Sequence, residues 1–245
     1  MNVVCADIIF RLMHYLIVGG TSGIGLQVVQ DLVDQGHEVT VWARRAQPDF
    51  GRSGVHYVQV DVTQDLPDDL GIPESLDGLV YCPGSINLAA FRQLKPETFS
   101  ADFDINVVGA VRVLHATLGA LSAGSGAGVV FLATTASRIG MNFHASVSTA
   151  KTALIGLAKS LAAEYAAKGV RFNVVAPSLT DTPMAERLLN NDKKRERAAE
   201  RHPLKRVGIP ADIAAAIEYF LDRNAGWVTG QVLSVDGGIS EISGL

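Results

Sequence analysis

The chain has few cysteines, few aromatic residues and no strong excess of either charge. Two cysteines in 245 residues, Cys5 and Cys82, do not make the disulfide framework of a small secreted protein, which favours a reducing cytoplasm. The net charge is −4 and no long basic block is present, so we expect no nucleic-acid partner. The six histidines are scattered without metal-ligand spacing, and we expect no metal site.

The sequence also lacks the features of a membrane or exported protein. No apolar run of transmembrane length is evident, so we expect no membrane partner. Residues 1–13 lack the basic start and the cleavage site of a signal peptide, and we expect them to be a short N-terminal extension. Hydrophobic residues make up 48% of the chain and charged residues 19%, which is enough for a substantial core. Residues 14–245 are expected to form one domain.

Short apolar runs alternate with helical patterns along the whole chain. This alternation predicts an α/β fold with a doubly wound parallel sheet (a Rossmann fold), in three layers and a single domain. The expected strands are 15–18, 39–43, 55–60, 78–82, 128–133, 170–175 and 231–235. Beyond a first helix that Gly36 closes, the expected helices lie near 97–122, 147–168 and 210–222.

The most informative stretch is a glycine-rich turn between the first apolar run and the first helical pattern. Such a strand–turn–helix unit aims free backbone N–H groups and the positive end of a helix at an anion. Glycines are needed there because side chains would keep a pyrophosphate away from the backbone. The residues expected to hold a dinucleotide are Gly19, Thr21, Ser22, Gly23, Ile24 and Gly25. The alternative is a glycine-rich loop without a ligand.

Two arginines, Arg44 and Arg45, follow the second expected strand. In this type of fold the tip of that strand meets the adenosine ribose. An acidic residue there binds the 2′-hydroxyl, whereas an arginine accommodates a 2′-phosphate. The pair therefore predicts NADP(H) as the cofactor, with NAD(H) less favoured. The alternative is a solvated pair of surface charges.

Small, polar and turn-forming residues follow four further strands, at 61–62, 82–84, 133–137 and 176–183. Ligands of open α/β sheets bind at the carboxyl ends of the strands, so these four ends predict one ligand groove beside the glycine turn. Residues 185–206 are polar and dense in charge. They are interpreted either as a substrate lid or as a plain solvated helix.

From Tyr15 to about Gly238 the chain resembles the short-chain dehydrogenase/reductase family in its classical form. The resemblance rests on the glycine turn, on the segments 104–109 and 177–182, and on the final strand 229–238. It implies hydride transfer to or from a small carbonyl or alcohol, and a homodimer or homotetramer packed through the helices near 97–122 and 147–168. It also implies cofactor contacts from Asp61, Val62, Cys82, Gly84, Lys151, Pro177, Thr180 and Thr182.

The active-site motifs depart from the family at one central position. The family's Tyr-x-x-x-Lys is here Val147-x-x-x-Lys151, and Thr134 stands where the family has serine. The resemblance implies that Asn106 orders a water relay and that Lys151 binds the nicotinamide ribose. Valine cannot donate or accept a proton, and loss of general acid–base help costs about 10²–10⁴-fold in rate. Both Thr134 and Asn106 also have a purely structural interpretation: Thr134 as a threonine at a strand end, and Asn106 as an asparagine that bridges a helix kink.

One substitute for the missing tyrosine is His144. If the helix has begun by residue 144, then His144, Ser148 and Lys151 share one face, and the histidine could act as the acid. Otherwise His144 lies in a loop before the helix and caps it or packs locally. The sequence thus leaves three functions open. The first is an NADP(H)-dependent oxidoreductase with an atypical proton donor, and the second is a catalytically silent NADP(H)-binding protein or hetero-oligomer subunit. The third, less favoured, is a redox or lyase-type reaction on a substrate that carries its own acid.

Overall fold

The computed structural model of the protein describes residues 11–45 and 50–242. Seven strands form one parallel sheet in the order β3-β2-β1-β4-β5-β6-β7, so the predicted doubly wound fold is confirmed. The strands are β1 (His14–Val18), β2 (Glu38–Ala43), β3 (Val55–Gln59), β4 (Gly78–Tyr81), β5 (Gly128–Leu132), β6 (Arg171–Pro177) and β7 (Val232–Val235). The strand order reverses direction between β1 and β4, and this switch point is where such folds bind ligands.

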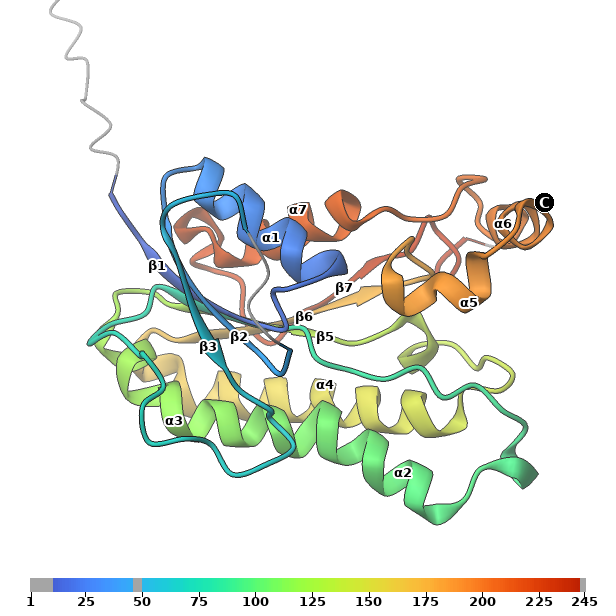
Figure 1. The fold of residues 1–245 in the computed structure, drawn as a ribbon, viewed down its shortest axis with the longest axis horizontal. Helices are drawn as coiled ribbons and strands as arrows, with labels where there is room; N and C mark the ends of the chain where they lie inside the picture. The colour runs from blue at the N-terminus through green and yellow to red at the C-terminus, as the bar shows by residue number, and fades with distance from the viewer. Residues whose placement is uncertain (1–10, 46–49, 243–245) are drawn as a thin grey trace, which may run out of the picture.

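Helices cover both faces of the sheet, as Figure 1 shows. On one face lie α1 (Gly23–Asp34) and α7 (Pro210–Leu221), which pack against each other. On the other face lie α2 (Pro96–Phe103), α3 (Gly109–Ala123) and α4 (Ala145–Tyr165). Two short helices, α5 (Glu186–Leu189) and α6 (Asp192–Glu200), follow β6. Single 3-10 turns occupy Phe91–Gln93, Thr135–Ser137, Ala166–Lys168, Pro183–Ala185 and Arg223–Ala225.

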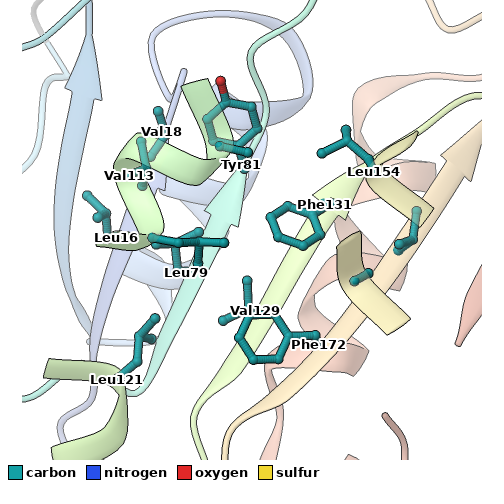
Figure 2. Packing of buried hydrophobic residues seen from close by; sticks show 14 of the residues in the cluster. Leu16, Val18, Leu79, Tyr81, Val113, Leu121, Val129, Phe131, Leu154 and Phe172 are labelled. Atoms are coloured by element: carbon teal, nitrogen blue, oxygen red, sulfur yellow. The ribbon is translucent and has the colours of Figure 1, made fainter. Parts of the chain in front are cut away.

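The strands begin and end within two residues of the expected positions because the central ones are buried on both faces. Alternate side chains of each strand enter two separate cores. Figure 2 shows the core beneath α3 and α4, where Leu16, Leu79 and Phe131 of the sheet meet Val113 and Leu154 of these helices. The sheet is therefore anchored on both sides, and its carboxyl edge is held in a fixed arrangement.

The helix expected at 97–122 differs from the prediction in its middle. A π-helical segment, Asp104–Val108, separates α2 from α3. Inside it the Asn106 amide donates to the Asp102 carbonyl oxygen at 2.7 Å, which is the kink-bridging contact considered above. Single π-helical turns inside α-helices are frequent at functional sites, because they reposition one side chain.

The continuous helix from Pro96 to Ala123 is also long and apolar enough to pass for a membrane span. This corrects the expectation that no segment has that length. Within its most apolar window 44% of the residues are buried inside the protein, including Val113 and Leu121 in the core. The apolar residues are thus those of a core helix that packs on the sheet and on α4.

Candidate functional site

The glycine turn after β1 has a geometry that only glycine allows. Gly19 and Gly23 have φ of +81° and +55°, in the left-handed region that side chains disfavour. A Cβ atom on Gly25 would lie 2.4 Å from the Gly19 carbonyl oxygen, so α1 packs directly on the turn. Ser22 precedes α1 and its side chain makes no capping hydrogen bond. The first N–H groups of α1 therefore remain available to an anion.

Loops from two other strands flank this turn. A Cβ on Gly19 would touch Cys82 at 3.3 Å and Pro83 at 3.4 Å, and a Cβ on Gly23 would touch Thr182 at 3.2 Å. The loop after β4 and the loop after β6 therefore form the walls of one groove over the turn. Cys82 is a small apolar wall residue, since burial raises the pKa of its thiol to about 12 and keeps it protonated.

The loop after β6 is held in place by its own hydrogen bonds. Thr180 is buried, donates its hydroxyl to the Ser178 carbonyl oxygen at 3.0 Å and pairs with Gly208 in a short bridge. Pro177 is the last residue of β6, opposite Val235 of β7. Pro177, Thr180 and Thr182 thus lie along one ordered loop on the groove.

Arg44 and Arg45 follow β2, the strand next to β1, and are exposed. Within residues 11–45 and 50–242 neither guanidinium group has a hydrogen bond or an ion pair. Asp61, after β3, accepts hydrogen bonds from the Thr63 N–H at 3.0 Å and the Thr63 hydroxyl at 2.7 Å. These bonds lower the pKa of Asp61, with a smaller contribution from the charge of Arg44. Val62 beside it is buried.

Lys151 lies at the floor of the groove with 6% of its surface exposed. Its ammonium group donates to the carbonyl oxygens of Leu132 at 2.6 Å and Pro83 at 3.4 Å. Burial lowers its pKa to about 8, although the Cys82 thiol and the Asp102 carboxylate act in the opposite direction. Lys151 is therefore a lysine whose proton is only weakly held near neutral pH.

Gly84 brings Lys151 and Asn106 to one small space. A Cβ on Gly84 would lie 3.0 Å from Lys151 Nζ and 3.1 Å from Asn106 Oδ1. Asn106 is fully buried, and its Oδ1 has no hydrogen-bond partner among the residues that the structure describes. A buried acceptor without a partner is costly, so this space suits a water or a ligand hydroxyl that donates to it.

A buried carboxylate, Asp102, lies behind this space and was missed by the sequence analysis. It is 1% exposed and accepts three hydrogen bonds, from Ser85 at 2.5 Å, Asn87 at 2.6 Å and Ser146 at 2.5 Å. The one feature of the sequence that could have pointed to Asp102 is its position four residues before Asn106, which puts both residues on one helical face. Nothing in the sequence marks this aspartate as buried, because its partners come from distant segments.

The position at which the resemblance implies a tyrosine is held by a buried apolar side chain. Val147 lies in the first turns of α4 and is 6% exposed. Thr134 follows β5, and its hydroxyl accepts a hydrogen bond from the Ala136 N–H at 3.3 Å. This bond caps the short turn Thr135–Ser137 and leaves the proton of the Thr134 hydroxyl free to donate.

The relay expected from His144 through Ser148 to Lys151 is not formed. Helix α4 begins at Ala145, so His144 only precedes it, and the condition for a shared helical face is not met. The His144 ring nitrogen Nδ1 lies 2.7 Å from the Asn142 carbonyl oxygen. Ser148 donates instead to the Ala136 carbonyl oxygen at 2.6 Å. Its hydroxyl is thus committed to the turn after β5.

The charged stretch 185–206 forms α5, α6 and the turn after them. Ala185, Leu189 and Ala198 make a small core of their own. An ion pair between Arg195 and Asp181 and a hydrogen bond of 2.8 Å between Ser178 and His202 tie this stretch to the loop after β6. The segment is therefore packed against the groove rather than extended into solvent.

The groove fits a phosphorylated dinucleotide both at the glycine turn and at its floor beside Lys151. The turn provides a cradle that a Cβ would fill, together with uncapped N–H groups of α1. The floor provides a buried ammonium group and an unpaired amide oxygen. Within the described part of the chain, no group of three or more His, Cys, Asp or Glu side chains is placed to hold a metal ion.

Comparisons with known proteins agree with this arrangement. A family model described as Enoyl-(Acyl carrier protein) reductase matches residues 18–240. The chain is 30% identical over 230 residues to the 3-oxoacyl-[acyl-carrier-protein] reductase MabA of Mycobacterium bovis, covering 91% of each chain. It is also 30% identical over 241 residues to a 2,5-dichloro-2,5-cyclohexadiene-1,4-diol dehydrogenase of Sphingobium indicum, covering 93% of this chain and 96% of that protein.

Solved structures resemble it over nearly its whole length. One, described as a short chain dehydrogenase/reductase family protein, has a TM-score of 0.86 and 31% identity, covering 94% of this chain and 98% of the other. Another, ElxO with NADP bound, has a TM-score of 0.84 and 25% identity, covering 94% of this chain and 99% of the other. With a family model over most of the sequence and relatives at this identity, the chain belongs to the short-chain dehydrogenase/reductase family.

Proposed function

We propose that this protein is an NADP(H)-dependent oxidoreductase that transfers a hydride to or from a small carbonyl or alcohol in the cytoplasm. The observation that carries the proposal is the pairing of Lys151 Nζ and Asn106 Oδ1 beside Gly84, at one end of a groove that begins at the glycine turn. NADP in the similar structure of ElxO supports the choice of cofactor. The reductase and dehydrogenase names of the relatives support the reaction class.

Each group of residues along the groove binds a different part of the dinucleotide. Backbone N–H groups between Gly19 and Gly25, including those of Thr21, Ser22, Gly23 and Ile24, hold the pyrophosphate. Arg44 and Arg45 hold the 2′-phosphate, and Asp61 and Val62 contact the adenine. Lys151 donates to the nicotinamide ribose, while Cys82 and Gly84 line one wall. Pro177, Thr180 and Thr182 bind the carboxamide. The bound cofactor supplies or accepts the hydride.

Val147 cannot donate a proton, so the proton for the substrate oxygen must come from one of the remaining polar groups. The Thr134 hydroxyl holds the substrate oxygen, and Asn106 holds a water next to the Lys151 ammonium group. His144 is a second candidate acid, because its Nε2 is not engaged by the hydrogen bond that Nδ1 makes. In carbonyl reduction the carbonyl carbon gains the hydride, which the cofactor would supply, and the oxygen gains a proton from an acid of the protein. The C–O double bond thus becomes a single bond, with one new C–H bond and one new O–H bond.

Val147 also supports a second candidate, a catalytically silent NADP(H)-binding protein or a subunit of a hetero-oligomer. A buried valine at the position of the proton donor removes the group that the family uses for chemistry. Cofactor binding needs only the turn, the arginines and Lys151. The two candidates share a groove and differ in turnover.

A screen of NADPH oxidation separates the two candidates. The panel contains ketones, quinones, diketones and a 3-oxoacyl thioester, each tested with the wild type and with Val147→Tyr. Turnover by the wild type, lost in Lys151→Met, supports the enzyme. Turnover that appears only in Val147→Tyr, with NADPH binding intact in both proteins, supports the silent protein.

A further inference from the structure

We propose that Tyr57 and Gln59 on β3 are positioning residues that set the preference for a 2′-phosphorylated dinucleotide by fixing the backbone of Arg44 and Arg45. The inference rests on the proposed function, because it assigns a role to side chains that support the two arginines rather than touch the cofactor. It concerns the edge strand of the sheet, which the proposed mechanism does not otherwise use (Figure 1).

Three successive carbonyl oxygens, those of the last residue of β2 and of the two residues after it, accept hydrogen bonds from these two side chains. The Tyr57 hydroxyl lies 2.8 Å from the Ala43 carbonyl oxygen and also contacts the carbonyl oxygen of Arg45. The Gln59 amide donates to the Arg44 carbonyl oxygen at 3.1 Å. A phenol has one proton, so Tyr57 shares it between two acceptors.

The pairing register of β2 and β3 explains why side chains bind the carbonyl oxygens of Arg44 and Arg45. Val41 pairs with Tyr57 and Ala43 pairs with Gln59, and the backbone bond from Val60 N–H to the Ala43 carbonyl oxygen is made just past the last paired residues. Beyond it, Arg44 and Arg45 leave the sheet. Residues two apart on a strand point to the same side, so Tyr57 and Gln59 reach the departing chain together.

Such anchoring favours phosphate binding for two reasons. A backbone that is already ordered loses less entropy when its guanidinium groups bind an anion. Carbonyl oxygens that already accept hydrogen bonds carry less unsatisfied negative charge toward that anion. Burial raises the pKa of the Tyr57 hydroxyl, so it stays a donor throughout the neutral range.

Binding titrations test the inference. The dissociation constants of NADPH and NADH, and of the fragments 2′,5′-ADP and 5′-AMP, are measured for the wild type, Tyr57→Phe and Gln59→Met. Tyr57→Phe keeps the ring beside Phe50, and Gln59 is exposed, so both variants are expected to fold. Tyr219→Phe, on the exposed part of α7, is the matched control.

Loss of about one hydrogen bond predicts a roughly tenfold weaker affinity for NADPH and 2′,5′-ADP in Tyr57→Phe. Affinity for NADH and 5′-AMP should stay within about twofold, and Tyr219→Phe should match the wild type. In an Arg44→Ala/Arg45→Ala background the effect of Tyr57→Phe should vanish, because the group that it supports is gone.

Equal losses for both cofactors, or no loss in either variant of β3, would overturn the inference while leaving the proposed function intact. A wild type that binds NADH more tightly than NADPH would instead contradict the proposed cofactor. The wild-type titration therefore reports on the function, and the variants report on the positioning role.

Discussion

Lys151 is the residue on which the account of the site depends most. Its ammonium group is buried, makes hydrogen bonds only to backbone carbonyl oxygens among the described residues, and has a pKa of about 8 instead of 10.5. Burial of a charge that no carboxylate contacts directly costs free energy, and proteins tolerate such a group mainly where it has a use. We therefore connect its position to ligand binding rather than to stability.

The lowered pKa of Lys151 predicts a pH-dependent stability. Between pH 8 and pH 10.5 the unfolded chain binds more protons at this side chain than the folded one, so stability rises with pH. The unfolding free energy of the wild type minus that of Lys151→Met should increase by about 2 kcal/mol between pH 7 and pH 9.5. Urea denaturation without cofactor at both pH values measures this, and parallel changes in the two proteins would disprove the lowered pKa.

Gly25 gives a second prediction at the scale of one residue. In Gly25→Ala the new methyl group would lie 2.4 Å from the Gly19 carbonyl oxygen, so the turn must open. We expect a loss of about 1–3 kcal/mol in unfolding free energy and at least tenfold weaker NADPH binding. Both are measured by urea denaturation and fluorescence titration.

Gly119→Ala in α3 is the matched control, because a Cβ there meets open space. It should gain about 0.5–1 kcal/mol from helix propensity and bind NADPH as the wild type does. If both alanine variants bind NADPH normally, the glycine turn is not the phosphate site.

Among the elements, the π-helical segment between α2 and α3 has the largest effect on the site. It places Asn106 beside Lys151, while Asp102 just before it ties the loop after β4 to the start of α4 through Ser85 and Ser146. Three segments that are distant in sequence are thus joined at one carboxylate. Such a hub fixes the space beside Gly84.

The hub predicts a graded response to substitution. Asp102→Ala removes the acceptor of three donors, of which Ser146 is buried, Ser85 is half-buried and Asn87 is exposed, and should cost about 2–3 kcal/mol of unfolding free energy. Ser146→Ala removes one donor and should cost about 1 kcal/mol. Thermal or urea unfolding of both variants gives the comparison, and equal, small losses would mean that the network is not a structural hub.

The sequence predicted the elements well and their irregularities poorly. Apolar runs located all seven strands, most clearly the five central ones, which are buried on both faces, whereas the edge strands β3 and β7 are partly exposed. Gly36, with φ of +81°, ended α1 as expected. The π-helical segment itself was not predicted, although an Asn106 side chain that bridges a helix kink was one of the two interpretations, and the structure contains that bond. The His144 relay failed because the helix begins one residue later and Ser148 bonds to the turn after β5.

At the scale of the whole molecule, the parallel sheet brings the carboxyl ends of six strands, β1 to β6, to one edge, and most of the site residues follow from that topology. Lys151 and Asn106 come from helices, Gly84 from a loop, and the glycines from the first turn. The convergence of the Gly84 loop on the glycine turn was predicted from the strand ends, whereas the placement of Lys151 and Asn106 was predicted only through the family resemblance. The roles of Tyr57 and Asp102 depend on contacts between strands and helices that sequence spacing does not encode.

The family resemblance also predicts self-association. An apolar groove lined by Phe99, Phe103, Val108 and Ala150 runs between α2 and α4, and Phe103 is 42% exposed. We expect light scattering after size exclusion to give two or four times the chain mass of 26.0 kDa. Phe103→Glu should shift the protein toward monomer, because a buried charge disfavours an apolar interface. A wild type that elutes as a monomer at micromolar concentration would contradict this.

The most direct test of the central claim is a calorimetric titration of the purified protein with NADPH and with NADH. The groove between the glycine turn and Lys151 predicts saturable binding of one NADPH per chain, tighter than that of NADH and weakened in Lys151→Met. Absence of binding up to millimolar NADPH, or binding that Gly25→Ala and Lys151→Met leave unchanged, would contradict the account.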